Sequence, residues 1–270
     1  MCFKKIWNWL TGAEPTPPPP PPPPPPPSQD GDITSEGDGN MIIAVINKST
    51  IVSNAEVKLM VRAVAKQARE HAALTWDLKP PRVVYRASEA TAEPGSWKVV
   101  IFDDADIAGA LGYHSDGPDG LPYGKVFVKI TQQYNMSIST VLSHEVLEIM
   151  MDPQFNYWAD NWNDGLSYAL EVADPVESDS YTIEIDGKPI EVSNFVLPAW
   201  FDPIPPPGAK FDWLGKLSKP FTMTDNGYVI IRDQSANRAV FGRSYPEWKK
   251  ELKLKSISRT KHRNEKKKGL

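Results

Sequence analysis

The segment SHEVLEIMMDP, residues 143–153, decides the fold and the chemistry expected of this chain. Its apolar residues predict a helix that ends before Pro153, because proline cannot continue a helix. His144 and Glu148 are four residues apart, so both side chains leave the same helix face and can reach one ion. Glu145 lies about a quarter turn round the helix. An imidazole and a carboxylate at this spacing are typical of a metal site.

The same segment matches the H-E-x-x-H arrangement of zinc peptidases, with glutamate in place of the second histidine. In that arrangement the first and fifth positions bind the metal, and the glutamate at the second position accepts a proton from the attacking water. We therefore expect His144 and Glu148 as ligands and Glu145 as the catalytic base. Alternatively, the glutamates are solvated residues beside an unrelated histidine. The first interpretation is favoured by apolar residues that allow the opposite side of the helix to be buried: Val141, Leu142, Val146, Leu147 and Ile149.

A third ligand is expected in YALEVADPVE, residues 168–177. In some zinc peptidases the third metal ligand is a glutamate on a second helix. An acidic residue shortly after that glutamate then orients another ligand without touching the ion. Glu171 is accordingly expected as the third ligand and Asp174 as the orienting residue. Their offset of three residues, where four is usual, weakens the match more for Asp174 than for Glu171. The alternative is an acidic surface loop.

A further histidine, His114, stands in the glycine-rich segment GALGYHSDG, residues 109–117. We expect it in a loop near the mouth of the cleft, with a catalytic role as donor to the oxyanion that forms on an attacked carbonyl. It could instead replace the missing histidine as a ligand, or be solvated. If Glu148 does not bind the ion, Asp152 is a further alternative ligand.

Residues 41–240 carry the pattern of one α+β domain. The half 41–153 reads as strand, helix, three strands and helix, and the strand at 125–130 is expected to border an extended substrate. The half 154–240 is smaller and irregular. Its aromatic residues are expected to pack it, with a substrate groove as the alternative: Phe155, Tyr157, Trp158, Trp162, Trp200 and Phe201. The segments expected in the first half are strands at 41–46, 81–87, 97–102 and 125–130 and helices at about 53–74 and 137–151.

Both ends of the chain differ from this domain in composition. Residues 1–12 have apolar residues at helical spacing and predict a short amphipathic helix that could contact a partner protein or a membrane surface. Residues 13–40 contain eleven consecutive prolines, which favour a polyproline II rod followed by a polar linker. Residues 241–270 form a basic tail: from Tyr245 onward ten Lys or Arg face three Glu, and this charge of +7 leaves −11 for the rest, since the total is −4.

Composition restricts the metal chemistry and the location. Cys2 is the only cysteine, so a thiolate metal cluster and an intrachain disulfide are both excluded, and any metal must use His and carboxylates. No apolar run approaches the ~18 residues of a membrane span. We therefore do not expect an integral membrane protein. Nucleic acid is expected as a partner only through the basic tail, because no recognition motif accompanies it.

Five linear motifs carry a resemblance to a known family: LGYHSDGPDGLPYGKVFV, VLSHEVLEIMMDP, YALEVADPVESDSY, VSNFVLPAWF and FDWLGKLSKPFTMTDNGY. Together they resemble an uncharacterised family of zincin-like proteins encoded by phages and bacteria. The resemblance covers about residues 95–232 and implies a zincin-like fold, a mixed sheet with an active-site helix, and a metal site. It also implies phage origin, and therefore a location in the virion or the host cytoplasm.

The expected function is that of a metal-dependent peptidase acting on a peptide or protein substrate. One divalent ion is expected, with Zn²⁺ first and Mn²⁺ or Ca²⁺ next. Two carboxylates and one imidazole neutralise such an ion and acidify its water less than two imidazoles and one carboxylate would. The alternative is a virion structural or attachment protein that keeps a zincin-like fold without catalysis. The two terminal attachment segments favour this alternative.

Overall fold

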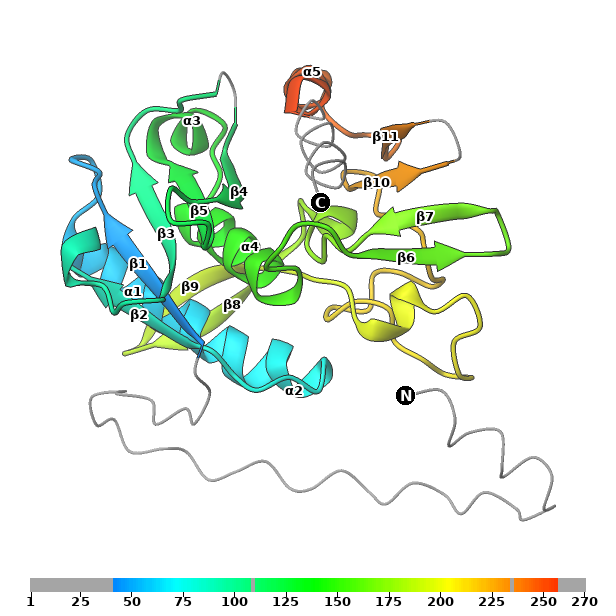
Figure 1. Ribbon diagram of the computed structural model, residues 1–270, viewed down its shortest axis with the longest axis horizontal. Coiled ribbons are helices and arrows are strands. Elements are labelled where there is room, and N and C mark those ends of the chain that lie inside the picture. The colour runs from blue at the N-terminus through cyan, green and yellow to red at the C-terminus, as the bar shows by residue number, and fades with distance from the viewer. Residues whose placement is uncertain (1–40, 108–109, 234–235, 257–270) are drawn as a thin grey trace, which may run out of the picture. The chain divides into compact units, whose positions relative to one another are not determined.

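The computed structural model describes residues 41–107, 110–233 and 236–256, with side chains up to Glu251. The amphipathic helix expected at 1–12, the rod at 13–40 and the end of the basic tail lie outside the described residues. All described residues belong to one compact unit. They form a mixed α+β fold, as the sequence predicts (Figure 1).

A five-stranded sheet forms the first half of this unit. Four strands run parallel, and β4 pairs antiparallel with β5 at the edge, giving the order β2-β1-β3-β5-β4. The central strands are buried on both faces and read as continuous β-branched and apolar runs, as parallel strands between two layers do. The strands are β1 (Ile42–Asn47), β2 (Arg82–Arg86), β3 (Trp97–Phe102), β4 (Gly112–Asp116) and β5 (Pro122–Phe127).

A long helical segment follows β1 and packs against one face of the sheet. Its start is fixed by a capping box, in which Ser53 and Glu56 each satisfy a backbone N–H of the other. The segment contains α1 (Asn54–Lys66), a π-helical turn η1 (Gln67–Ala72) and α2 (Ala73–Thr75), so the helix expected at 53–74 is confirmed. Its valines and alanines join residues of the sheet and of α4 in the main core.

Helix α4 (Ile138–Met151) lies at the centre of the described structure (Figure 1). All of its residues are buried, because it contacts the sheet, α1 and a hairpin of β8 (Ser180–Ile185) and β9 (Lys188–Ser193). Ser143 ties the helix to this hairpin: its hydroxyl donates to Thr140 O over 2.9 Å and accepts from the Ser193 N–H over 2.7 Å. A helix surrounded in this way holds its polar side chains inside the protein.

The second half contains a separate four-stranded sheet of order β11-β10-β7-β6. Trp200 is buried between Tyr168 and Phe221, which confirms the expected packing role, whereas Trp162 is 66% exposed. The elements of this half are β6 (Trp158–Asn161), β7 (Leu166–Ala169), β10 (Tyr228–Arg232), β11 (Asn237–Phe241) and the 3₁₀ turns η3 (Asp174–Val176) and η4 (Pro198–Phe201). The 3₁₀ turn η2 (Glu89–Thr91) and helix α3 (Val128–Gln133) belong to the first half, and helix α5 (Glu247–Ser256) follows the second.

Three sequence expectations about the sheet are wrong. The strand expected at 125–130 ends at Phe127, and α3 begins at the next residue. This strand also has partners on both sides, so its backbone cannot accept a substrate strand. The glycine-rich segment around His114 is not a loop but the edge strand β4, which the backbone ladder with β5 holds in place.

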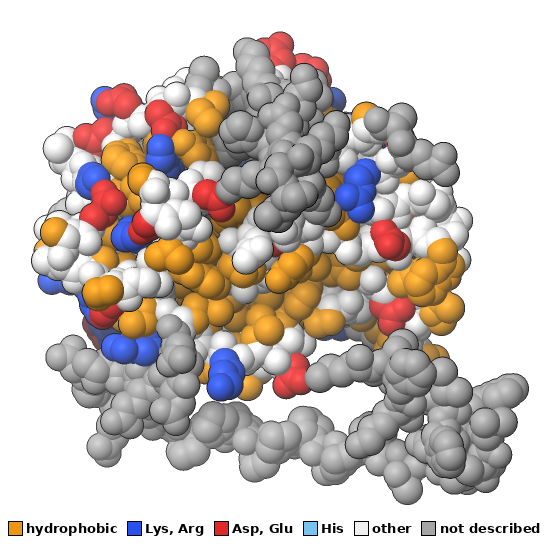
Figure 2. All heavy atoms as spheres, in the orientation of Figure 1, with side chains coloured by type: hydrophobic (Ala, Val, Ile, Leu, Met, Phe, Trp, Pro, Cys, Tyr) orange, Lys and Arg blue, Asp and Glu red, His pale blue; other side chains and the backbone are white. Residues whose placement is uncertain are grey.

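Hydrophobic side chains spread across the middle of the face drawn in Figure 2, and no histidine is visible among the described residues there. Among the described residues, none of the helices has the length and apolar character needed to cross a bilayer.

The contact between Ser143 and Ser193 gives the first prediction. Ser143→Ala removes the acceptor of a buried N–H, and an unsatisfied buried donor costs about 1–3 kcal/mol. We expect the free energy of unfolding in urea to fall by about this amount. The matched control is Ser180→Ala on the exposed side of the same hairpin, which should change it by less than about 0.5 kcal/mol. Equal effects of the two substitutions would contradict the role given to Ser143.

Candidate metal site

Three ionisable side chains of α4 lie inside the protein. His144, Glu145 and Glu148 are 8%, 4% and 3% exposed. The interpretation of these glutamates as solvated residues of an amphipathic helix is therefore excluded. Burying carboxylates costs free energy unless cations or donors compensate them. The surroundings of α4 must supply that compensation.

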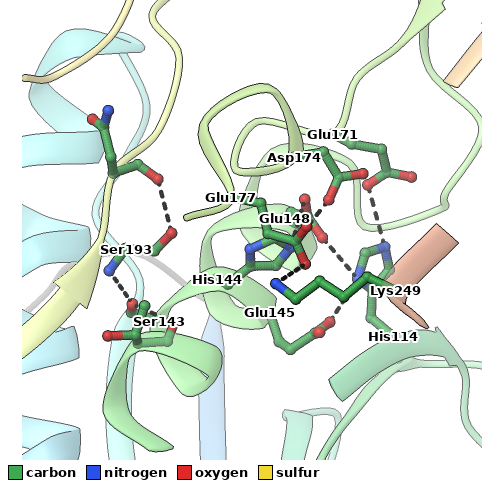
Figure 3. Close-up of polar contacts among 12 residues, drawn as sticks. His114, Ser143, His144, Glu145, Glu148, Glu171, Asp174, Glu177, Ser193 and Lys249 are labelled. Atoms are coloured by element: carbon green, nitrogen blue, oxygen red, sulfur yellow. Dashed lines mark hydrogen bonds and ion pairs between the residues drawn. The ribbon is translucent and has the colours of Figure 1, made fainter. Parts of the chain in front are cut away.

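The first group of facing side chains contains His144, Glu148 and Asp174. His144 Nε2 lies 3.2 Å from Glu148 Oε1 and 3.2 Å from Asp174 Oδ1 (Figure 3). Asp174 begins the turn η3, where Pro175 fixes the backbone, and it is 2% exposed. The acidic surface loop considered for this residue is thus also excluded.

The second group lies on the other side of Glu148. His114 reaches it from β4: its Nδ1 lies 3.0 Å from Glu145 Oε2 and 3.4 Å from Glu148 Oε2. The other ring nitrogen, Nε2, lies 3.4 Å from Glu171 Oε2. Phe155 packs against the ring with centroids 4.8 Å apart. The His114 side chain is 10% exposed, so it is not a solvated histidine.

The approach of β4 to α4 depends on a glycine. A Cβ at Gly112 would lie 2.6 Å from Glu145 Oε1 and 2.9 Å from Val141 Cγ1, which is closer than atoms can pack. Gly112 therefore lets the edge strand lie directly against the carboxylate of Glu145, two residues from His114.

The pKa values follow from burial against the opposing charges. Burial by itself would lower the pKa of His114, but the charge of Glu171 and the hydrogen bond to Glu145 outweigh it and raise the pKa to about 10. Burial would likewise lower the pKa of His144, yet Glu148 and Asp174 raise it well above its usual value. Burial, reinforced by the charge of Asp174, raises the pKa of Glu148 to about 8.

The first group has the chemistry of a metal site. Glu148 Oε1 and Asp174 Oδ1 are buried and make no hydrogen bond, although each lies close to His144 Nε2. Ligands about 2.0–2.2 Å from a tetrahedral ion lie about 3.3–3.6 Å apart, close to the spacing of these atoms. Both groups lie within metal-binding distance, and Glu148 is the residue they share.

The structure brings all six residues singled out by the sequence into one cluster, but it distributes them differently. Asp174, expected to orient a ligand, lies beside His144, whereas Glu171, expected as the third ligand, lies beside His114. The ligand set His144, Glu148 and Glu171 stays a prediction, and the geometry favours Asp174 in the third position. Asp152 accepts hydrogen bonds from the backbone of Asn156 and Tyr157 at the end of α4.

Sequence analysis missed a second polar contact near the cluster. Tyr245 donates a hydrogen bond of 2.7 Å to Glu177 Oε2, and Lys249 Nζ lies 3.6 Å from Glu177 Oε1. Lys249 is 6% exposed, and its neighbour Trp248 stacks on Tyr134. The sequence contains one signal for this contact, the helical spacing of Tyr245, Trp248 and Leu252 at the start of the basic tail. That spacing does not indicate that Lys249 is buried.

Comparisons with models of protein families, with curated proteins and with solved structures find no match to this chain.

The raised pKa values predict how the stability of the metal-free protein depends on pH. Folded His114 keeps a proton that the unfolded chain loses above pH 6.5, so its stabilisation disappears as pH rises toward 10. Glu148 is more easily ionised when unfolded, so folding also becomes less favourable between pH 4.5 and 8. His71, whose pKa burial lowers, opposes this trend only near and below 6.5.

We therefore expect the free energy of unfolding, measured in urea with EDTA, to decrease from pH 7 to pH 9. Added Zn²⁺ should reduce this slope, because the ion replaces protons in the cluster. A free energy of unfolding that rises with pH in EDTA would show that the cluster is not protonated as described.

Proposed function

We propose that this protein is a divalent-metal-dependent hydrolase of the zincin type that acts on peptides or proteins. The observation that carries this proposal is the convergence of His144 Nε2, Glu148 Oε1 and Asp174 Oδ1, two of which are buried oxygens without hydrogen bonds. Membership of the phage and bacterial zincin-like family is part of the proposal and rests on the sequence motifs.

One ion is proposed in the group of His144, Glu148 and Asp174. Zn²⁺ is the first choice, because it is commonly bound by one to three histidines and carboxylates with a position left for water. Mn²⁺ and Ca²⁺ are the alternatives, because two carboxylates make this a hard, oxygen-rich site. When bound, the ion would polarise a carbonyl group and acidify a water molecule.

Glu145 is the proposed general base. It follows His144 on α4, and its carboxylate is fixed from two sides, by the hydrogen bond with His114 and by the close approach of Gly112. A carboxylate held in place next to the ion accepts a proton from attacking water without first reorganising. Because His114 is hydrogen-bonded to Glu145, we propose that His114 positions this base. To act as the oxyanion donor expected from the sequence, His114 would have to break this hydrogen bond.

The substrate is proposed to bind along β4. This strand is the edge of the sheet and contacts α4, and an edge strand is the place where an extended peptide can add to a sheet. The edge is thus at residues 112–116 rather than at 125–130. A peptide paired there would pass His114, the residue that contacts the α4 carboxylates.

A second candidate function is a binding protein of the virion in which the ion is structural. The burial of the site favours it, since the side chains of His114, Glu145 and Glu148 are 10%, 6% and 4% exposed. A structural ion needs no access for substrate.

Metal content tests the ligands. Purified full-length protein should hold one divalent ion at one added equivalent, and His144→Ala should lose it, because a three-ligand site does not survive the loss of a ligand. Asp174→Asn should also lose it, whereas Glu171→Gln should keep it; the reverse result would restore the ligand set expected from sequence. His71→Ala, outside the cluster, is the control and should bind like the unaltered protein. The measurement is elemental analysis after dialysis.

Catalysis is tested separately. Glu145→Gln should keep the ion and reduce hydrolysis of unfolded protein substrates by about 100-fold or more, because an amide cannot accept the proton. Glu184→Gln, an exposed substitution in β8, should leave the rate unchanged. Bound zinc without hydrolysis of any substrate in the unaltered protein would favour the binding protein over the hydrolase.

A further inference from the structure

The two oxygens of Glu148 face different histidines. Oε1 lies 3.2 Å from His144 Nε2, and Oε2 lies 3.4 Å from His114 Nδ1. The carboxylate is 3% exposed, so water does not solvate it freely. His114 Nδ1 also lies 3.0 Å from Glu145 Oε2, so this nitrogen faces two carboxylates. Glu148 therefore presents one oxygen to each of two groups of ligand atoms.

The group on the His114 side has the dimensions of a second cation site. From His114 Nδ1, the oxygens of Glu145 and Glu148 are 3.0 and 3.4 Å away, and the three atoms lie within 4.8 Å of one another. Ligands of an octahedral or tetrahedral ion with bonds of about 2.1 Å lie about 3.0–3.4 Å apart. The group thus matches this spacing with one nitrogen and two oxygens.

His114 is also oriented as a metal ligand is. While Nδ1 faces the group, Nε2 lies 3.4 Å from Glu171 Oε2 on the opposite side of the ring. Metal-binding histidines commonly direct their second nitrogen at a carboxylate, which fixes the ring and raises its basicity. Glu171 therefore acts on this group through the imidazole (Figure 3).

The burial of the carboxylates points in the same direction. Glu145, Glu148, Glu171 and Asp174 are all at most 6% exposed. A divalent ion beside His114 would compensate the negative charges of Glu145 and Glu148 within this buried group.

From these observations we infer that His114 Nδ1, Glu145 and Glu148 form a second divalent-cation site, with Glu148 bridging two ions through its two oxygens. This inference rests on the proposed function for the first ion and adds a regulatory consequence. An ion in the second site occupies Glu145, the proposed general base. Hydrolysis should therefore reach a maximum near one equivalent of metal and fall when the second site fills.

The test measures metal directly, by calorimetric titration and elemental analysis of the full-length protein with Zn²⁺. The unaltered protein should bind two ions in sequence, the first more tightly. His114→Gln and Glu145→Gln should each lose the second ion and keep the first. Two variants are used so that a folding defect in one, checked by circular dichroism, does not decide the result. Binding of one ion up to millimolar Zn²⁺, or of two ions by both variants, would overturn the inference.

A bridging carboxylate has its own spectroscopic signature. Protein loaded with two equivalents of Mn²⁺ should give the electron paramagnetic resonance spectrum of a spin-coupled pair, and His114→Gln should give the spectrum of isolated Mn²⁺. Two uncoupled ions in the unaltered protein would refute the bridge.

The outcomes separate this inference from the proposed function. One ion with hydrolysis keeps the hydrolase and refutes the second site. Two coupled ions without hydrolysis at any metal concentration keep the second site and refute the hydrolase. A rate that does not fall between one and ten equivalents of Zn²⁺, with two ions bound, would refute the regulatory consequence.

Discussion

The carboxylate of Glu148, buried between two imidazoles, is the constraint on which the site depends. A negative charge at 3% exposure is tolerated only where cations or protons compensate it. The chain meets this requirement from two sides: β4 brings His114 to one oxygen, and α4 itself brings His144 to the other. Three features hold charged side chains around Glu148. Gly112 lets the edge strand β4 approach with His114, and the turn η3 places Asp174 beside His144.

The central position of α4 explains how so much charge is kept inside. Its inward residues join the sheet and α1, and the hairpin β8–β9 covers another side through Ser143. With apolar contacts on most of its circumference, the helix keeps its fold although it carries three buried ionisable groups. A helix exposed on one face would let these glutamates turn toward water, and the two groups of ligand atoms would not form.

The sequence predicted the helices and strands that have strong apolar periodicity. It did not predict the elements that form only through pairing with another strand or through a turn. The runs at 97–102 and 137–151 predicted β3 and α4 closely, because apolar spacing records burial directly. Strand β4 contains glycine and polar residues, and only its ladder with β5 makes it a strand. Spacing identified Glu171 and Asp174 together but could not assign them, since the turn beginning at Asp174 decides which carboxylate reaches His144.

Residues 245–249, at the start of α5 and just before it, reduce the negative charge near the cluster. Glu177 follows Asp174 by three residues and is 7% exposed, so it would add a fifth buried carboxylate to the same region. Lys249 and the Tyr245 hydroxyl compensate it instead, and the stacking of Trp248 on Tyr134 holds the helix where they can do so. Because this carboxylate lies beside its own cation, it adds less negative charge to the cluster than its burial alone would suggest. The C-terminal helix therefore contributes to the electrostatics of the site without supplying a ligand.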